Sequence, residues 1–357
     1  MGELRKVAVK DVAVNDVHVV VPDGIDDPRR PSGGNVYDRR ACRGLSALGW
    51  AVHEHTVPGR WPRPEASARA AVAAALARMP SGALVLVDGL VASAVPEVLE
   101  PEAGRLRLVV LLHMPQDEPL ELAALSASSA IVATSQWTRQ WLSDHYSLPR
   151  TPVYVVTPGV DTAKVAAGTP SGGRLLCVGA VTPLKGQDLL LKALATVDDP
   201  AWRCVFAGAL DLDPEFVARL RRLAEDRGLS DRVCFAGPRA ADELDRAYAE
   251  ADVLVLASRA ETYGMVVTEA LAHGLPVIAR EVGGVPEALG HAADGSRPGL
   301  LVPPGDPQTL GHALSRWLGD AGKRERLRAA ARSRRQSLSD WAQTSRELSA
   351  VLSEIAE

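Results

Sequence analysis

Short runs of continuously apolar residues alternate along the chain with segments in which apolar residues recur at helical spacing. Between the first two runs, for example, Tyr37, Ala41, Leu45 and Leu48 fall on one helical face. Runs that are apolar at every position are typical of parallel strands covered by helices on both faces, so the pattern predicts an α/β protein. The predicted strands cover residues 17–21, 51–57, 83–87, 106–112, 130–134 and 153–156, and then residues 174–178, 203–207, 232–236, 252–257, 276–279 and 300–302.

The predicted strands form two series, separated by a glycine-, serine- and proline-rich stretch at residues 158–173. A length of 357 residues also fits two domains of ordinary size. We predict two doubly wound domains, at residues 1–165 and 166–337, and expect the segment 338–357 to pack back on the first. Two such domains leave a cleft between the carboxyl ends of their strands, where ligands bind in open α/β sheets.

Composition narrows the possible partners and the compartment. With 40 basic and 44 acidic residues the net charge is −4, so the chain lacks the basic excess of a nucleic-acid-binding protein. No apolar run is long enough to cross a membrane, and acidic residues interrupt the apolar N-terminal stretch, so we expect no secretory signal. The cysteines Cys42, Cys177, Cys204 and Cys234 form no C-x-x-C pair, and we expect buried free thiols in a cytoplasmic protein.

The segment with the most candidate chemistry is residues 257–276, because common nucleotide motifs such as G-x-G-x-x-G and the P-loop are absent. A polar turn follows a predicted strand here, and a helix begins near Gly264. A glycine at a helix start lets backbone N–H groups approach an anion. Glu261 and Glu269 stand eight positions apart, and a carboxylate can accept hydrogen bonds from both hydroxyls of a ribose or sugar. Alone, this pair is as compatible with a structural role, in which Glu261 caps the helix and Glu269 is a surface charge, as with a diol-binding role.

The neighbouring motifs favour the diol-binding role. The segment resembles the E-x7-E motif of glycosyltransferase family 4, which contains retaining enzymes of the GT-B fold. Further segments are similar to motifs of that family, in its order and spacing. They are CVGAVTPLKG at 177–186, the strand at 232–237, GGVPE at 283–287 and GLLVPPGD at 299–306, with looser matches at SGG 32–34, His113 and TPGVD 157–161. The resemblance implies two Rossmann-like domains that face a cleft.

The resemblance also implies roles for residues of the second domain. Glu269 would hold the ribose of a sugar nucleotide, and Glu261 would lie against the donor sugar. Lys185 would neutralise the diphosphate, a task that suits the compact charge of lysine. The backbone amides that would contact the sugar or the diphosphate belong to Tyr263, Gly264, Met265 and Val266.

In the first domain, Gly33 and Gly34 follow the first predicted strand and would let a phosphate or the acceptor approach the backbone. His113 follows another strand and, by the resemblance, would hydrogen-bond the donor sugar. The alternatives are a plain glycine turn and a strand-end histidine without a role. We interpret His113, Glu261 and Lys185 as the catalytic group.

One position departs from the family pattern: Ala180 stands where the family usually has arginine. A charged hydrogen bond to the diphosphate, worth about 1.5–3 kcal/mol, is thereby missing. Candidates for a substitute cation are Arg259, Arg280 and the arginines of residues 29–43.

Metal ligation is not expected. His53 and His55 share one face of a predicted strand, but no cluster of carboxylates or cysteines completes a site. Asp211 and Asp213 are similar to the D-x-D motif of metal-dependent transferases. However, Asp213 followed by Pro214 is typical of a helix start.

The resemblance implies a metal-independent hexosyltransferase that acts with retention and needs no permanently bound cofactor. Its co-substrate would be a nucleoside-diphosphate sugar, most commonly a UDP-sugar, with GDP- and ADP-sugars left open. The acceptor would be a small soluble molecule, and we expect neither a nucleic-acid nor a membrane partner. The alternatives are a non-catalytic sugar-nucleotide-binding protein of the GT-B fold, and an epimerase or phosphorylase of that fold.

Overall fold

A computed structural model of the chain describes residues 15–28, 31–116 and 118–357. Two expectations from the sequence depend partly on other positions: the absence of a signal at the N-terminus, and the role of Arg29 and Arg30. Residues 1–14 and these two arginines lie outside the described residues.

The first half of the chain forms a six-stranded parallel sheet in the order β2-β1-β3-β4-β5-β6. Nearly every side chain of the central strands is buried, which explains why they are apolar at every position. Each predicted strand is present, with ends that differ by no more than a residue or two. The strands are β1 Asp16–Pro22, β2 Ala51–Val57, β3 Leu84–Asp88, β4 Arg107–Leu112, β5 Ala130–Ala133 and β6 Val153–Val155.

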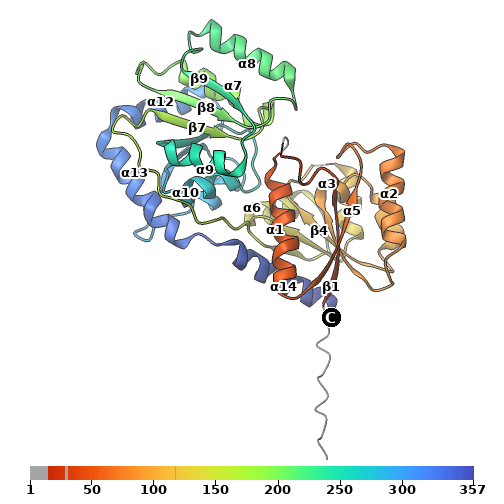
Figure 1. The fold of residues 1–357 in the computed structure, drawn as a ribbon. Helices are drawn as coiled ribbons and strands as arrows, with labels where there is room; N and C mark the ends of the chain where they lie inside the picture. The colour runs from red at the N-terminus through yellow and green to blue at the C-terminus, as the bar shows by residue number, and fades with distance from the viewer. Residues whose placement is uncertain (1–14, 29–30, 117) are drawn as a thin grey trace, which may run out of the picture.

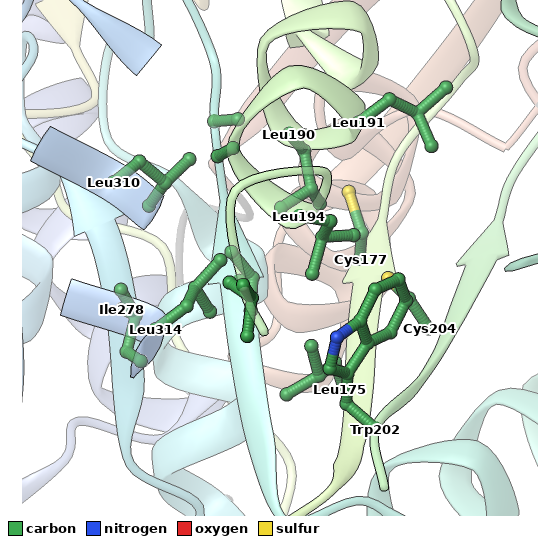
Figure 2. Close-up of a cluster of buried hydrophobic side chains, with 14 of the residues drawn as sticks. Leu175, Cys177, Leu190, Leu191, Leu194, Trp202, Cys204, Ile278, Leu310 and Leu314 are labelled. Carbon is green, nitrogen blue, oxygen red and sulfur yellow. The ribbon is translucent and has the colours of Figure 1, made fainter. Parts of the chain in front are cut away.

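The second half forms another six-stranded parallel sheet, in the order β12-β11-β10-β7-β8-β9. Figure 2 shows one face of its core, where Trp202, Leu190 and Leu194 pack with Leu175 and Cys177. The sequence predicted these strands also. They are β7 Arg174–Val178, β8 Arg203–Ala207, β9 Val233–Gly237, β10 Val253–Leu256, β11 Val277–Arg280 and β12 Gly299–Val302.

Helices cover both faces of each sheet (Figure 1). In the first half they are α1 Gly33–Ala47, α2 Ala66–Ala77, α3 Gly89–Ala92, α4 Pro96–Leu99, α5 Pro119–Ala127 and α6 Gln136–His145. In the second half they are α7 Gln187–Leu194, α8 Pro214–Asp226, α9 Ala241–Glu250, α10 Met265–Ala272, α11 Val285–Leu289, α12 Pro307–Gly319 and α13 Ala321–Arg334. Three short 3₁₀ turns lie at Glu100–Glu102, Pro183–Lys185 and Arg335–Ser337.

The last helix, α14 Trp341–Ala356, leaves the second sheet and packs beside α1 of the first (Figure 1). Its Leu348 and Leu352 are fully buried in the core that contains the side chains of β1. The two helices approach closely at Gly44, where a Cβ atom would lie 1.9 Å from the hydroxyl oxygen of Ser345. The core of the first half therefore depends on residues far along the chain.

The expectation of buried thiols is wrong for one cysteine. All four cysteines are free, and Cys42, Cys177 and Cys204 are buried, but Cys234 is exposed. Cys234 lies on β9, which is the edge strand of its sheet and is mostly only half-buried. Among the described residues, no helix combines the length and the apolar character that a membrane crossing requires.

Candidate active site

A cleft of about 430 Å³ lies between the two halves of the molecule, at the carboxyl ends of strands from both sheets. Residues that the sequence singled out gather here, although they lie far apart along the chain. The predicted site residues that line the cleft are Gly33, Gly34, His113, Lys185, Glu261, Tyr263, Gly264, Met265, Val266 and Glu269.

Glu261 lies in the loop after β10 and is buried. Its Oε1 atom accepts two hydrogen bonds, each 2.7 Å long, from the Lys185 ammonium and the Ser258 hydroxyl. Lys185 reaches this carboxylate from the turn after β7. There Gly186 has a φ of +68°, and a Cβ atom on it would lie 2.1 Å from the Ala257 carbonyl oxygen. The pair places a cation and an anion together on one wall of the cleft.

The glycine pair of the GGVPE segment packs directly against the Glu261 loop. A Cβ atom on Gly283 would lie 1.6 Å from the Glu261 carbonyl oxygen, and one on Gly284 would lie 2.1 Å from that of Thr262. The Gly284 N–H also donates to the Glu261 carbonyl at 3.0 Å. These glycines therefore fix the backbone that presents the Glu261 side chain.

Helix α10 begins at the cleft, directly after Gly264. This glycine has a φ of +90°, a conformation that other residues rarely adopt, and no side chain caps the helix. Met265 and Val266 of the first turn line the cleft. The partial positive charge of a helix N-terminus is therefore directed toward this space, which suits an anionic ligand.

Glu269 lies on α10, one turn and a half from its start, and lines the cleft. Its Oε2 atom accepts a 2.7 Å hydrogen bond from the buried hydroxyl of Tyr248 on α9. Burial raises the pKa of Glu269, and the Tyr248 hydrogen bond opposes that change. Tyr248 was not anticipated from the sequence, because its spacing of 21 residues from Glu269 carries no local signal.

His113 follows β4, and its ring is held by residues of α1 and β3. Its Nε2 atom lies 2.7 Å from Oδ1 of Asp38 and 3.6 Å from Oδ2 of Asp88, and both aspartates are buried. Although burial acts in the opposite direction, the two carboxylates raise the pKa of His113. Burial and the nearby Asp38 charge raise the pKa of Asp88 to about 7. Neither aspartate was singled out from the sequence.

The predicted glycine pair has a steric role in this arrangement. A Cβ atom on Gly34 would lie 3.1 Å from Cδ2 of the His113 ring, and one on Gly33 would lie 3.2 Å from the sulfur of Met265. Gly34 and Asp38 are one helical turn apart, so the same face of α1 supports the His113 ring and bonds it. Gly33 lies where the two halves of the molecule approach each other.

Sequence models of known protein families identify the family to which the chain belongs. A sequence model of glycosyltransferase family 4 matches residues 15–164, and a model of glycosyl transferases group 1 matches residues 169–334. The chain belongs to the family 4 glycosyltransferases. Two relatives of this family 4 chain, from Jonesia denitrificans and Frankia alni, are called D-inositol 3-phosphate glycosyltransferases and are 35% and 36% identical to it. The matches cover 65% and 63% of this chain, but only 58% and 59% of those relatives.

Solved structures confirm the GT-B fold of the family 4 chain. Sucrose-phosphate synthase from Thermosynechococcus elongatus superposes with a TM-score of 0.76 over 95% of this chain and 98% of its own, at 21% identity. Anabaena Alr3699/HepE, solved with UDP-glucose, gives a TM-score of 0.74 over 95% and 99% of the two chains, at 20% identity.

None of the arginines that the sequence suggested as a substitute cation for Ala180 lines the cleft within the described residues. Arg259 binds Asp188 with distances of 2.9 and 2.8 Å, and neither it nor Arg280 lines the cleft. The arginines of α1 do not line it either. Arg239, in the loop after β9, does line the cleft, as does Ala180 itself. Its position could not be inferred from the family motifs, since it lies between two of them.

Potential metal ligands also gather beside the cleft. Within the described residues, the ligand atoms of Asp38, Asp88 and His113 form one group with separations of at most 4.8 Å. His53 and His55 are joined by His18 of β1, whose Nδ1 lies 3.0 Å from Nε2 of His55. These three histidines lie on the β1–β2 pair and do not line the cleft, so they are separate from the group that contains His113.

Asp213 lies at a helix start, as the sequence predicted. Its carboxylate caps α8 by accepting a 2.8 Å hydrogen bond from the backbone N–H of Phe216, and Pro214 takes the first helical position.

Proposed function

We propose that the chain is a retaining glycosyltransferase that moves a hexose from a nucleoside-diphosphate sugar to a hydroxyl of a small soluble acceptor. The observation that carries this proposal is one cleft wall that joins the Lys185–Glu261 pair, the start of α10 and the Glu269 carboxylate. A cation, a helix N-terminus and a diol-binding carboxylate are the groups that a sugar diphosphate and its ribose require.

The second half of the molecule binds the donor in this proposal. Glu269 accepts hydrogen bonds from the ribose hydroxyls, while the backbone amides from Tyr263 to Val266 and Lys185 contact the diphosphate. Glu261 lies against the donor sugar. UDP is the first nucleotide to test, because the similar Anabaena protein was solved with UDP-glucose.

Catalysis in this proposal depends on stabilising the leaving group. The bond between the anomeric carbon and the diphosphate oxygen breaks, and the electron pair leaves with the diphosphate. The acceptor oxygen attacks from the same side, and its proton passes to the departing diphosphate, so the configuration is retained. Lys185 and the α10 N-terminus stabilise the negative charge that develops on the diphosphate. Because this charge is larger in the transition state than in the bound donor, they stabilise the transition state more and lower the barrier.

The acceptor binds against the first half, which we propose as a domain that ends near residue 165. Beside the Gly33–Gly34 pair and His113, its wall of the cleft includes Pro22, Asn35, Leu90, Met114 and Gln116. The relatives are called D-inositol 3-phosphate glycosyltransferases, so inositol phosphates belong in the acceptor screen beside uncharged cyclitols and sugars.

Thermal shifts with UDP, GDP, ADP and dTDP test the donor site. A ligand at about 100 times its Kd stabilises the folded protein by about 2.7 kcal/mol. We expect one diphosphate to raise the Tm by several degrees. If none of the four does so, the proposed donor site is wrong.

Product analysis tests the transfer itself. With the selected sugar nucleotide and the acceptor panel, we expect a glycoside whose anomeric proton shows retention in NMR spectra. Donor binding without any product would favour a non-catalytic binding protein, for which Ala180 is the supporting observation. A changed donor sugar in the absence of acceptor would indicate an epimerase.

A further inference from the structure

The ring of His113 is held in place by three residues of α1. Gly34 lies so close to one side of the ring that a Cβ atom there would be 3.1 Å from its Cδ2, and the Tyr37 ring lies edge-on with centroids 5.4 Å apart. Asp38, on the same helix, binds Nε2 at 2.7 Å. The histidine therefore has one orientation, and α1 sets it.

The neighbours of Nε2 decide which ring nitrogen carries the proton in neutral His113. The two groups near Nε2 are carboxylates, Asp38 at 2.7 Å and Asp88 at 3.6 Å. A carboxylate accepts hydrogen bonds, so Nε2 is the nitrogen that carries the hydrogen. Nδ1 then has a free lone pair, and no described residue donates to it, while the ring lines the cleft.

We propose that Asp38 is a positioning residue that fixes His113 as the Nε2–H tautomer, so that Nδ1 accepts a hydrogen bond from a hydroxyl of the donor sugar. This inference rests on the proposed function for the identity of the ligand. It goes beyond that function because it assigns a role to Asp38, which does not line the cleft. The arrangement is that of a histidine oriented by an acid on its far side.

The proposal has a consequence for the pH dependence of sugar binding. When His113 is protonated, Nδ1 carries a hydrogen and can no longer accept one. The charged groups that face the ring among the described residues are Asp38 of α1 and Asp88 at the end of β3, and both favour the imidazolium. Sugar recognition should therefore weaken as the pH falls through the raised pKa of His113, and removal of the Asp38 charge should move that transition to lower pH.

The first experiment measures the tautomer directly, without any ligand. In the protein labelled with ¹⁵N-histidine, we expect the His113 signals of a single Nε2–H form above its pKa. In Asp38→Asn we expect a mixture of the two tautomers and a lower pKa of His113, since a charged hydrogen bond is lost. Asp26→Asn is the matched control, because it removes a carboxylate that binds Arg39 on the outer face of α1. A wild-type Nδ1–H form would overturn the proposal, even if Asp38→Asn does not fold.

The second experiment separates this inference from the proposed function. UDP and UDP-glucose are titrated into both proteins. We expect Asp38→Asn to lose about tenfold in affinity for UDP-glucose and to keep its affinity for UDP, which has no sugar. Equal losses for both ligands, or no loss for either, would overturn the proposal. If wild-type protein binds neither ligand, the proposed function fails, and the tautomer measurement still decides the role of Asp38.

Discussion

Replacing Glu269 with glutamine should change two measured quantities in opposite directions. We expect the ligand-free protein to become more stable and nucleotide binding to become weaker. Burial raises the pKa of Glu269, and the Tyr248 hydroxyl compensates only partly. An acid whose pKa is raised by folding reduces stability once the pH exceeds its unfolded value of 4.5. Glutamine keeps the shape and can accept the Tyr248 hydrogen bond, but it carries no charge.

The sizes of both effects follow from the surroundings of the side chain. Glu269 lines the cleft and is only partly buried, so we expect a gain in stability of about 1 kcal/mol. That gain corresponds to a rise in Tm of about 2–4 °C. For binding, loss of a charged hydrogen bond to a ribose hydroxyl costs about 1.5–3 kcal/mol, which raises the Kd for the nucleotide by roughly 10- to 150-fold.

Calorimetry with UDP and thermal unfolding at pH 7 would measure these two quantities. Tyr248→Phe is the matched control, because it keeps the carboxylate and removes its hydrogen-bond donor. That variant should be less stable than wild type. A Glu269→Gln protein with lower stability and an unchanged Kd would refute both the cost of the buried charge and the ribose contact.

Three further changes test other features. Arg239→Gln should raise the KM for the donor about tenfold without changing the Tm, because the arginine lines the same cleft as Ala180 and its ion pair with Glu243 is long, at 3.9 Å. An unchanged KM would exclude Arg239 as the substitute cation. Gly44→Ala should lower the stability by about 1–3 kcal/mol, although alanine favours helices, because its Cβ atom would overlap the Ser345 side chain. Urea unfolding measures this, and a more stable variant would contradict the close packing of α1 and α14. A pKa raised to about 7 for Asp88 makes the wild-type protein lose stability as the pH rises from about 4 to 7. Asp88→Asn should therefore be more stable than wild type above pH 7 and lose this advantage toward pH 4. A pH-independent difference in urea unfolding would argue against the raised pKa.

The sequence predicted the strands well because burial on both faces leaves a continuous apolar signal. The largest departures are one residue at a strand end, such as β9, where the prediction began at residue 232 and the strand begins at Val233. Periodicity does not say which strand lies at an edge of the sheet, because that depends on the strand order. This is why the exposure of Cys234 on β9 was missed.

The site was predictable where family motifs carry it and not where the fold alone brings residues together. Glu261 and Lys185 belong to motifs, and the structure places them 2.7 Å apart although 76 positions separate them. Asp38 lies 75 positions before His113, on a helix where it is the one buried charge beside three arginines that are exposed or partly exposed. Tyr248 likewise has the spacing of an ordinary core residue of α9, and only the packing of α9 on α10 gives its hydroxyl a partner.

The position of α14 has a consequence for how the protein is made. The core beneath β1 is incomplete without Leu348 and Leu352, yet those residues are synthesised almost 200 positions after the last strand of that sheet. At about 5–20 residues per second, the ribosome needs roughly 10–40 s to reach them. During that time the nascent first sheet has an exposed apolar face while the second sheet is completed. The part of the protein that emerges first is therefore the part that finishes folding last, and a chaperone that shields this face would protect newly made chains from aggregation.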